Sequence, residues 1–185
     1  MKAVMLSVRP QWCKLIAGGQ KTIEVRKTVP KISPPFKCFI YQTRSGKVPT
    51  GLFTCDGEIM GRSVKNGKVI GAFVCDGYVR FGVGPLDGQY MIFPNDLAEA
   101  CMTGEEFERY GNGKMLYGWH ISHLKIYDRP KELSEFYYNE KRYCEHEICE
   151  GCPKYELPDA NGEYAFCCEW ERPITRAPQS WCYIG

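Results

Sequence analysis

Residues 18–27 read Gly-Gly-Gln-Lys-Thr-Ile-Glu-Val-Arg-Lys, a glycine turn followed by alternating apolar and charged residues. The two-residue period of a strand would place the apolar Ile23 and Val25 on one face and the charged residues on the other. Glu24 and Arg26 would then stand about 6 to 7 Å apart, and Lys21 could lean toward them from the turn. The simplest interpretation is an ion pair on a solvated strand face, worth under about 1 kcal/mol. The alternative is a functional group of charges on a rigid element.

The residues before this strand predict a short helix. Pro10 follows a run that is typical of a strand, and proline is favoured in the first turn of a helix. Trp12, Leu15 and Ile16 have the spacing of one buried stripe, and the two glycines that follow can cap the helix C-terminus. The predicted order is therefore strand, helix, glycine turn and strand.

This order, together with the pattern Gly-x-Lys-x-x-Glu-x-Arg, resembles the signature of the ASCH domain, a family of the PUA-like β-barrels. The matching residues are Pro10, Gly19, Lys21, Glu24 and Arg26. Residues 175–183, Thr-Arg-Ala-Pro-Gln-Ser-Trp-Cys-Tyr, resemble the closing strand of phage and bacterial ASCH-domain proteins. The resemblance covers residues 1–185 as one domain, with a loop insertion at 44–67 and a cysteine-rich, zinc-binding subregion at 140–170.

The middle of the chain predicts further strands. Residues 36–43, 68–81 and 116–127 are rich in β-branched and aromatic residues, and Gly71 and Gly77 suggest bends within the second of these runs. Residues 44–67 contain repeated turn signals and predict a long loop with at most a weak hairpin.

Short helices are predicted between these strands. Asn95 can cap a helix over 96–101, Thr103 and Glu106 fit a capping box for a helix over 104–110, and 130–138 is a third candidate. Strands and helices do not alternate as in a parallel sheet. The pattern therefore favours a mixed α+β fold, a small, mostly antiparallel barrel with short peripheral helices, as the PUA-like resemblance implies.

Length and composition are those of one ordinary globular domain. The chain has 185 residues, and no apolar run approaches the roughly 20 residues that a membrane-spanning helix needs. The first eight residues lack the apolar region of a signal peptide, so we expect a cytoplasmic protein.

Charge is distributed unevenly along the chain, although the formal net charge is only +2. The first 50 residues hold ten Lys or Arg and one Glu, a net +9, whereas the remaining 135 hold 14 basic and 21 acidic residues, a net −7. A basic face for a polyanion would produce such asymmetry, and so would accidental charge placement.

Eleven cysteines in a chain without a secretory signal favour thiols or metal ligands over disulfides. Six of them lie in apolar or strand-like surroundings and are expected to be ordinary buried residues. These are Cys13, Cys38, Cys55, Cys75, Cys101 and Cys182.

The other five cysteines have the layout of a tetrahedral structural zinc site, a Cys-x2-Cys pair followed at a distance by a third and a fourth thiolate. They are Cys144, Cys149, Cys152, Cys167 and Cys168. We expect the first three plus one of Cys167 and Cys168 to bind zinc, and His146 could replace Cys144. All ligands would come from the protein, so the predicted role is structural. The alternative is a reduced, metal-free loop.

The sequence contains no convincing catalytic triad and no phosphate-binding glycine loop. The charged motif suits recognition of RNA or a nucleotide: Arg9, Lys21 or Arg26 can hold a phosphate, and Glu24 can accept a hydrogen bond from an exocyclic amine. The expected binding residues are Arg9, Lys21, Glu24, Arg26, Arg176, Gln179, Ser180 and Trp181.

An aromatic side chain could stack on the base of such a ligand. Trp181 and Trp12 are the two candidates. Core packing is the alternative for Trp181, because tryptophan is usually well buried.

Two other functions remain open. N4-acetylcytidine amidohydrolases, a sister group with a similar barrel, carry Lys-Thr-Ile-Thr-Ile-Arg, in which the second threonine is the presumed nucleophile activated by the lysine. This chain keeps Lys21 but has Glu24 at the nucleophile position, so these two would be the catalytic residues with Glu24 as general base. The acid that completes such a site would be Glu99, Glu105, Glu106 or Glu108. The third possibility is a protein-interaction module of a phage or mobile element.

Overall fold

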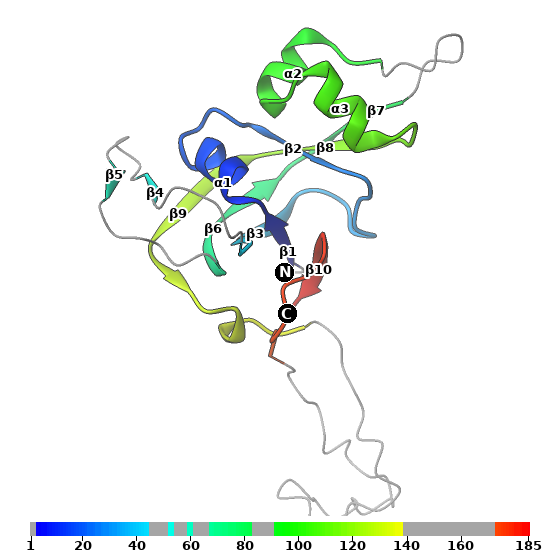
Figure 1. The fold of residues 1–185 in the computed structure, drawn as a ribbon. Coiled ribbons are helices and arrows are strands. Elements are labelled where there is room, and N and C mark those ends of the chain that lie inside the picture. Colours follow the sequence, from blue (N-terminus) through cyan, green and yellow to red (C-terminus); the bar gives the residue numbers. More distant parts are fainter. Residues whose placement is uncertain (1–2, 45–51, 54–58, 61–66, 83–90, 139–172) are drawn as a thin grey trace, which may run out of the picture.

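In a computed structural model of the chain, residues 3–44, 52–53, 59–60, 67–82, 91–138 and 173–185 are described. Ten strands, three α-helices and one short 3₁₀ helix lie in these ranges (Figure 1). The strands are β1 (Ala3–Val8), β2 (Ile23–Arg26), β3 (Phe36–Gln42), β4 (Leu52–Phe53), β5 (Ile59–Met60), β6 (Lys68–Cys75), β7 (Tyr78–Phe81), β8 (Leu116–His120), β9 (Ser122–Lys131) and β10 (Trp181–Ile184). The helices are α1 (Pro10–Ala17), α2 (Pro94–Ala100), α3 (Gly104–Gly111) and the 3₁₀ helix η1 (Leu133–Glu135).

Eight of the strands form two sheets, one of five strands in the order β10-β1-β3-β6-β9 and one of three in the order β2-β8-β7. Only β1 and β3 pair in parallel within these two sheets, so the expected mixed α+β, mostly antiparallel architecture is confirmed. The predicted weak hairpin in residues 44–67 is present as β4 and β5. Within the described residues, no backbone ladder closes the two sheets into the expected barrel.

Two of the predicted long strands bend and pass from one sheet to the other. Residues 68–81 divide into β6 and β7, and residues 116–127 divide into β8 and β9. Gly71 lies where the pairing of β6 with β9 is irregular, and a Cβ atom there would stand 2.5 Å from the Lys125 carbonyl oxygen. The expected irregularities are present at both glycines, because the pairing register of β6 shifts next to Gly71 and Gly77 lies between β6 and β7.

The first helix follows its prediction in outline. Pro10 occupies the first turn of α1 and Gly18 caps its C-terminus, while Gly19 adopts a φ of 70° that favours glycine. The buried stripe differs from the expected one: Cys13 and Ile16 are buried, whereas Trp12 and Leu15 are only partly covered.

The later helices confirm one prediction and correct two. In α3, the Thr103 hydroxyl accepts from the Glu106 amide and the Glu106 carboxylate accepts from the Thr103 amide, as a capping box requires. Asn95 does not cap α2, because the helix already begins at Pro94. The helix expected over 130–138 is wrong, since β9 continues to Lys131 and only the single turn η1 follows.

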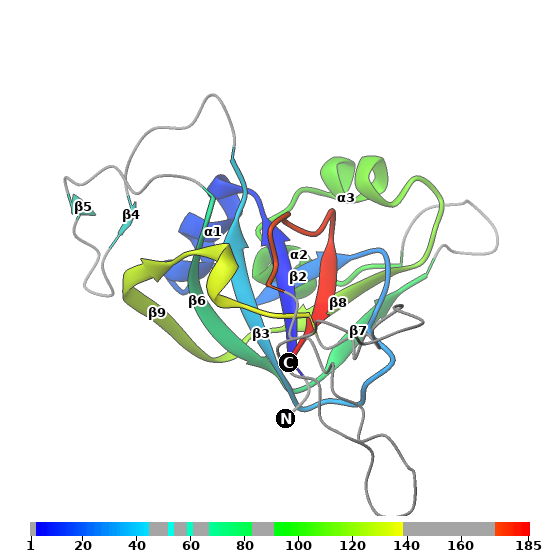
Figure 2. The same ribbon diagram turned by 90° about the horizontal axis from the view of Figure 1, so that it is seen from below.

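Three clusters of buried apolar side chains hold the sheets and helices together. One lies under α1 and contains Trp119 and Phe73, and a second contains Met5 and Phe136. The third lies between β2, β7, β8 and the helices α2 and α3, which sit together above the smaller sheet in Figure 1. Seen from below, β10 runs beside β1 (Figure 2), which matches their antiparallel pairing.

Of the six cysteines that were expected to be buried, three are buried in the part of the chain that the structure describes. Cys13, Cys38 and Cys75 are buried as expected, whereas Cys101 and Cys182 are partly exposed, and Cys55 lies outside the described residues. Burial raises the pKa of the Cys75 thiol to about 12. None of the described helices has the length and apolarity required to cross a membrane.

Candidate functional site

The motif strand β2 is covered on both faces. Ile23 and Val25 pack into the third cluster beneath α2 and α3, so the predicted alternation is correct. Glu24 and Arg26 point the other way, yet only 5% and 6% of their surfaces are exposed, and Lys21 is 3% exposed. The expected solvated strand face is therefore wrong, because the rest of the fold lies against this second face of the smaller sheet.

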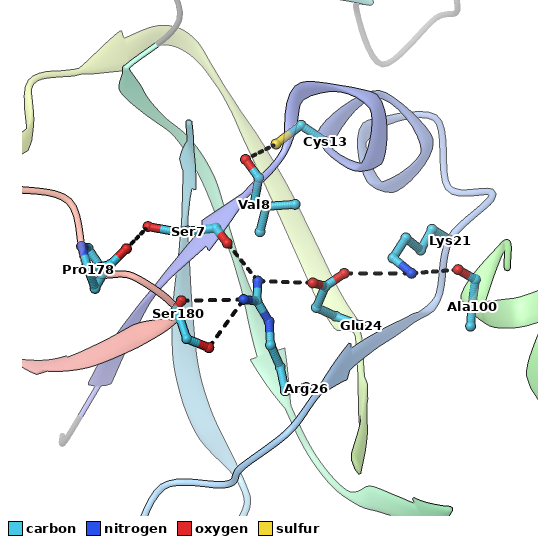
Figure 3. A network of polar contacts seen from close by, with 9 residues as sticks. All are labelled: Ser7, Val8, Cys13, Lys21, Glu24, Arg26, Ala100, Pro178 and Ser180. Atoms are coloured by element: carbon cyan, nitrogen blue, oxygen red, sulfur yellow. Dashed lines mark hydrogen bonds and ion pairs between the residues drawn. The ribbon is translucent and has the colours of Figure 1, made fainter. Parts of the chain in front are cut away.

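Lys21, Glu24 and Arg26 form one chain of polar contacts, which we call the charged network (Figure 3). Glu24 stands in the middle: its Oε1 lies 2.9 Å from Arg26 Nη2, and its Oε2 lies 3.6 Å from Lys21 Nζ. Lys21 Nζ also donates to the Ala100 carbonyl at 2.5 Å and stands 4.9 Å from the centre of the Trp12 ring. The network thus ties the C-terminal end of α2 to β2.

Arg26 joins the two sheets where no backbone ladder does. Its Nη2 donates to the Ser7 carbonyl at 2.8 Å, and its Nη1 lies 3.4 Å from both the carbonyl and the hydroxyl oxygen of Ser180. Ser7 belongs to β1, and Ser180 immediately precedes β10. Ser7 itself bonds to the same segment, through its amide to Ser180 and its hydroxyl to Pro178. One guanidinium therefore bridges β2 and the edge of the larger sheet.

The charged network is not fully satisfied. It sets two cations against one carboxylate in a buried position, and burial lowers the pKa of Lys21 although Glu24 acts in the opposite direction. Among the described residues, Glu24 Oε2 and Arg26 Nε have no hydrogen-bond partner. A carboxylate oxygen and a guanidinium N–H thus retain the capacity to bind a water or a ligand.

A second group of cations lies next to the charged network, around Tyr110 of α3. Lys27 directly follows β2, and its Nζ lies 5.1 Å from the centre of the Tyr110 ring. Burial raises the pKa of Tyr110, the charge of Glu24 adds to that rise, and the charges of Arg26 and Arg9 act against it. Arg9 and Lys27 are exposed.

The sequence did not indicate Tyr110 or Ser7 as site residues. Tyr110 follows the buried Phe107 by one helical turn and is typical of an ordinary amphipathic helix. Ser7 enters the site through its backbone carbonyl, which every residue has. No local signal could therefore have found either residue.

The expected C-terminal binding residues differ in their contacts with the charged network. Ser180 contacts Arg26 as described above, whereas Arg176 and Gln179 are exposed and, among the described residues, make no hydrogen bond or ion pair with the charged network. Trp181 packs against the rings of Trp119 and Tyr183, and its indole N–H donates to the Thr28 hydroxyl at 3.0 Å. Trp181 thus packs against the first cluster while part of its surface stays exposed, and stacking on a base stays a prediction.

The acid required by the amidohydrolase interpretation is not brought to Lys21 within the described part of the chain. The only carboxylate there that pairs with Lys21 is Glu24. Glu106 is engaged in the capping box of α3. The other three candidates on α2 and α3 are exposed, namely Glu99, Glu105 and Glu108.

The predicted zinc ligands lie outside the described residues. They are Cys144, His146, Cys149, Cys152, Cys167 and Cys168. Within the described ranges, no three His, Cys, Asp or Glu side chains gather closely enough to hold a metal ion.

Solved structures resemble the chain, whereas no protein-family model and no curated protein matches it. ASCH from Zymomonas mobilis is 21% identical with a TM-score of 0.50, and the match covers 71% of this chain and 73% of that chain. A point variant of the same protein gives 21% identity and a TM-score of 0.50, with 71% and 74% covered. At this identity the likeness concerns the fold, in agreement with the motif around β2. The chain therefore has the fold of an ASCH domain.

Proposed function

We propose that this chain binds RNA or a nucleotide, and that Glu24 reads an amino group on the base. One observation carries the proposal: among the described residues, Glu24 Oε2 is buried without a hydrogen-bond partner, and its ion-pair partner, the Lys21 amine, stands 3.6 Å away. Such an atom is costly unless a donor reaches it, and the exocyclic amine of cytosine or adenine is a suitable donor.

Two further features support the proposal. The ten basic residues among the first 50 supply the positive charge that attracts a polyanion. The ASCH resemblance points the same way, because PUA-like domains are associated with RNA and modified bases.

The test is calorimetric titration of the full chain with cytidine, adenosine, uridine and a short single-stranded RNA. We expect the two amine-bearing nucleosides to bind more tightly than uridine, by about tenfold for one lost charge-assisted hydrogen bond. Glu24→Gln should reduce this preference. Absence of binding to all four probes by wild-type protein would refute the proposal.

Glu24 also supports the fold, so Glu24→Gln can weaken binding by destabilising the chain. A second measurement therefore uses the wild-type protein. Backbone amide shifts of the wild-type chain should change most at residues 21–27 when cytidine is added. Binding that leaves these amides unmoved would contradict a role for Glu24.

One observation favours an amidohydrolase as the second candidate: burial lowers the pKa of Lys21, directly beside Glu24. In such a reaction Glu24 would take a proton from water, the hydroxyl would add to the acyl carbon, and the C–N bond would break with the proton passing to the amine. Incubation with an N4-acylated cytidine and chromatography of the products tests it. Product formation that Lys21→Ala abolishes would support hydrolysis, and unchanged substrate would exclude it.

From the cysteine spacing alone, we also propose a structural zinc site formed by Cys144, Cys149, Cys152 and one of Cys167 and Cys168. Native mass spectrometry before and after a chelator tests it. We expect one zinc to be lost on chelation and a Cys149→Ser/Cys152→Ser variant to purify without metal. Metal-free wild-type protein purified with zinc in the medium would overturn the proposal.

A further inference from the structure

We propose that Arg9, Lys27 and Tyr110 form a phosphate-binding subsite, so that the ligand is a nucleotide or RNA rather than an uncharged nucleoside. This inference rests on the proposed function and places the phosphate outside the charged network. The three residues come from different parts of the fold: Arg9 directly precedes α1, Lys27 follows β2 and Tyr110 lies on α3.

The basic residues of the charged network are poorly suited to this role. The two terminal nitrogens of Arg26 already contact Glu24, Ser7 and Ser180. The Lys21 amine already contacts Glu24 and the Ala100 carbonyl. Both side chains are almost completely buried. A phosphate bound by them would have to displace the contacts that join the sheets.

Arg9 and Lys27 are in the opposite situation. Both are exposed, and neither forms an ion pair with any other residue in the described ranges. Lys27 is instead held over the Tyr110 ring, and the charges of Arg26 and Arg9 lower the pKa of Tyr110 while the charge of Glu24 raises it. Tyr110 thus has a basic neighbour in Lys27, and its O–H can donate to a phosphate oxygen.

The start of α1 adds to the same field. Arg9 is the N-cap residue, no side chain caps this helix, and its first turn contains no acidic residue. The positive end of the helix dipole is thus uncompensated at the position of Arg9.

The experiment compares cytidine and adenosine with their monophosphates, using the full chain and the variants Lys27→Gln and Lys37→Gln. Lys37 is the matched control, because it is exposed and its Nζ stands 4.7 Å from the Phe39 ring, on β3 and away from Tyr110. We expect the monophosphates to bind wild-type protein more tightly, and Lys27→Gln to weaken them about tenfold while leaving the nucleosides unchanged.

Tyr110→Phe and salt dependence supply independent readouts. Tyr110→Phe removes one neutral donor and should weaken the monophosphates about threefold. For a short RNA, Lys27→Gln should reduce the slope of log affinity against log salt by about 0.7, the value for one phosphate contact on a single strand. Lys37→Gln should leave both quantities as in wild type.

The outcomes separate the two proposals. If nucleotides bind but Lys27→Gln and Lys37→Gln weaken them equally, the subsite is wrong and nucleotide binding stands. If nucleosides and their monophosphates bind equally well, the subsite is also wrong. If wild-type protein binds none of the probes, the proposed function fails and the subsite fails with it.

Discussion

The Glu24–Arg26 pair and the Lys131–Glu135 pair have similar chemistry but opposite surroundings. In both, a carboxylate meets a cation a few residues away, at 2.9 Å in the first pair and 3.8 Å in the second. The first pair is 7–8% exposed at its side chains, whereas the second is about half exposed, at 49–50%. The comparison shows that burial, not the type of charges, decides what an ion pair does in this fold.

Water screens the exposed pair, so the attraction between its two charges contributes little to stability. The buried pair has given up its hydration and depends on three partners, Ser7 of β1, Ser180 before β10 and Lys21 before β2. Removing one member leaves an uncompensated charge in a low-dielectric interior.

The largest expected effect is that of Glu24→Gln. The variant leaves Lys21 and Arg26 buried without a counter-charge, so we expect the free energy of unfolding to fall by about 3–5 kcal/mol. Urea denaturation followed by circular dichroism measures it. Glu135→Gln is the matched control on the exposed pair and should cost under about 1 kcal/mol. Equal losses in the two variants would show that burial does not distinguish the pairs.

Arg26→Lys should have an intermediate effect. The charge opposite Glu24 is kept, but a lysine cannot reach Ser7 and Ser180 at the same time with a planar fork. We expect the free energy of unfolding to fall by about 1–3 kcal/mol, the cost of leaving a buried carbonyl without its hydrogen bond. The same denaturation assay checks it. A loss as large as that of Glu24→Gln would mean that geometry matters as much as charge.

The smallest expected effect concerns a third pair, His120 and Asp76, whose Nδ1 and Oδ1 atoms lie 2.6 Å apart at 48% and 43% exposure. The hydrogen bond from His120 lowers the pKa of Asp76 from its ordinary 3.8. Because folding lowers this pKa, the contribution of the pair is present above about pH 4 and is lost as the pH falls through the folded pKa. We expect it to be under about 1 kcal/mol, owing to solvent screening.

Carbon-detected NMR titration of the Asp76 carboxyl checks this pH dependence. His120→Gln should move the pKa of Asp76 back toward 3.8 and should leave stability at neutral pH almost unchanged. An Asp76 pKa that is the same in wild type and variant would remove His120 as the cause of the shift.

Local patterns in the sequence were sufficient for the elements that local forces define. The order of β1, α1, glycine turn and β2, the capping box at Thr103 and the bend at Gly71 depend on neighbouring residues or on glycine itself. Predictions failed where a partner far along the chain decides. The helix expected over 130–138 gave way to β9 because β6 pairs with this segment as far as Lys131.

The same distinction applies to the site. The proximity of Lys21, Glu24 and Arg26 follows from local sequence, because a glycine turn and a two-residue period place them side by side. Their burial depends on the folded chain, since their further partners Ala100 and Ser180 lie 79 and 154 positions away. Desolvation depends on what covers a side chain, and the covering elements here come from distant parts of the chain.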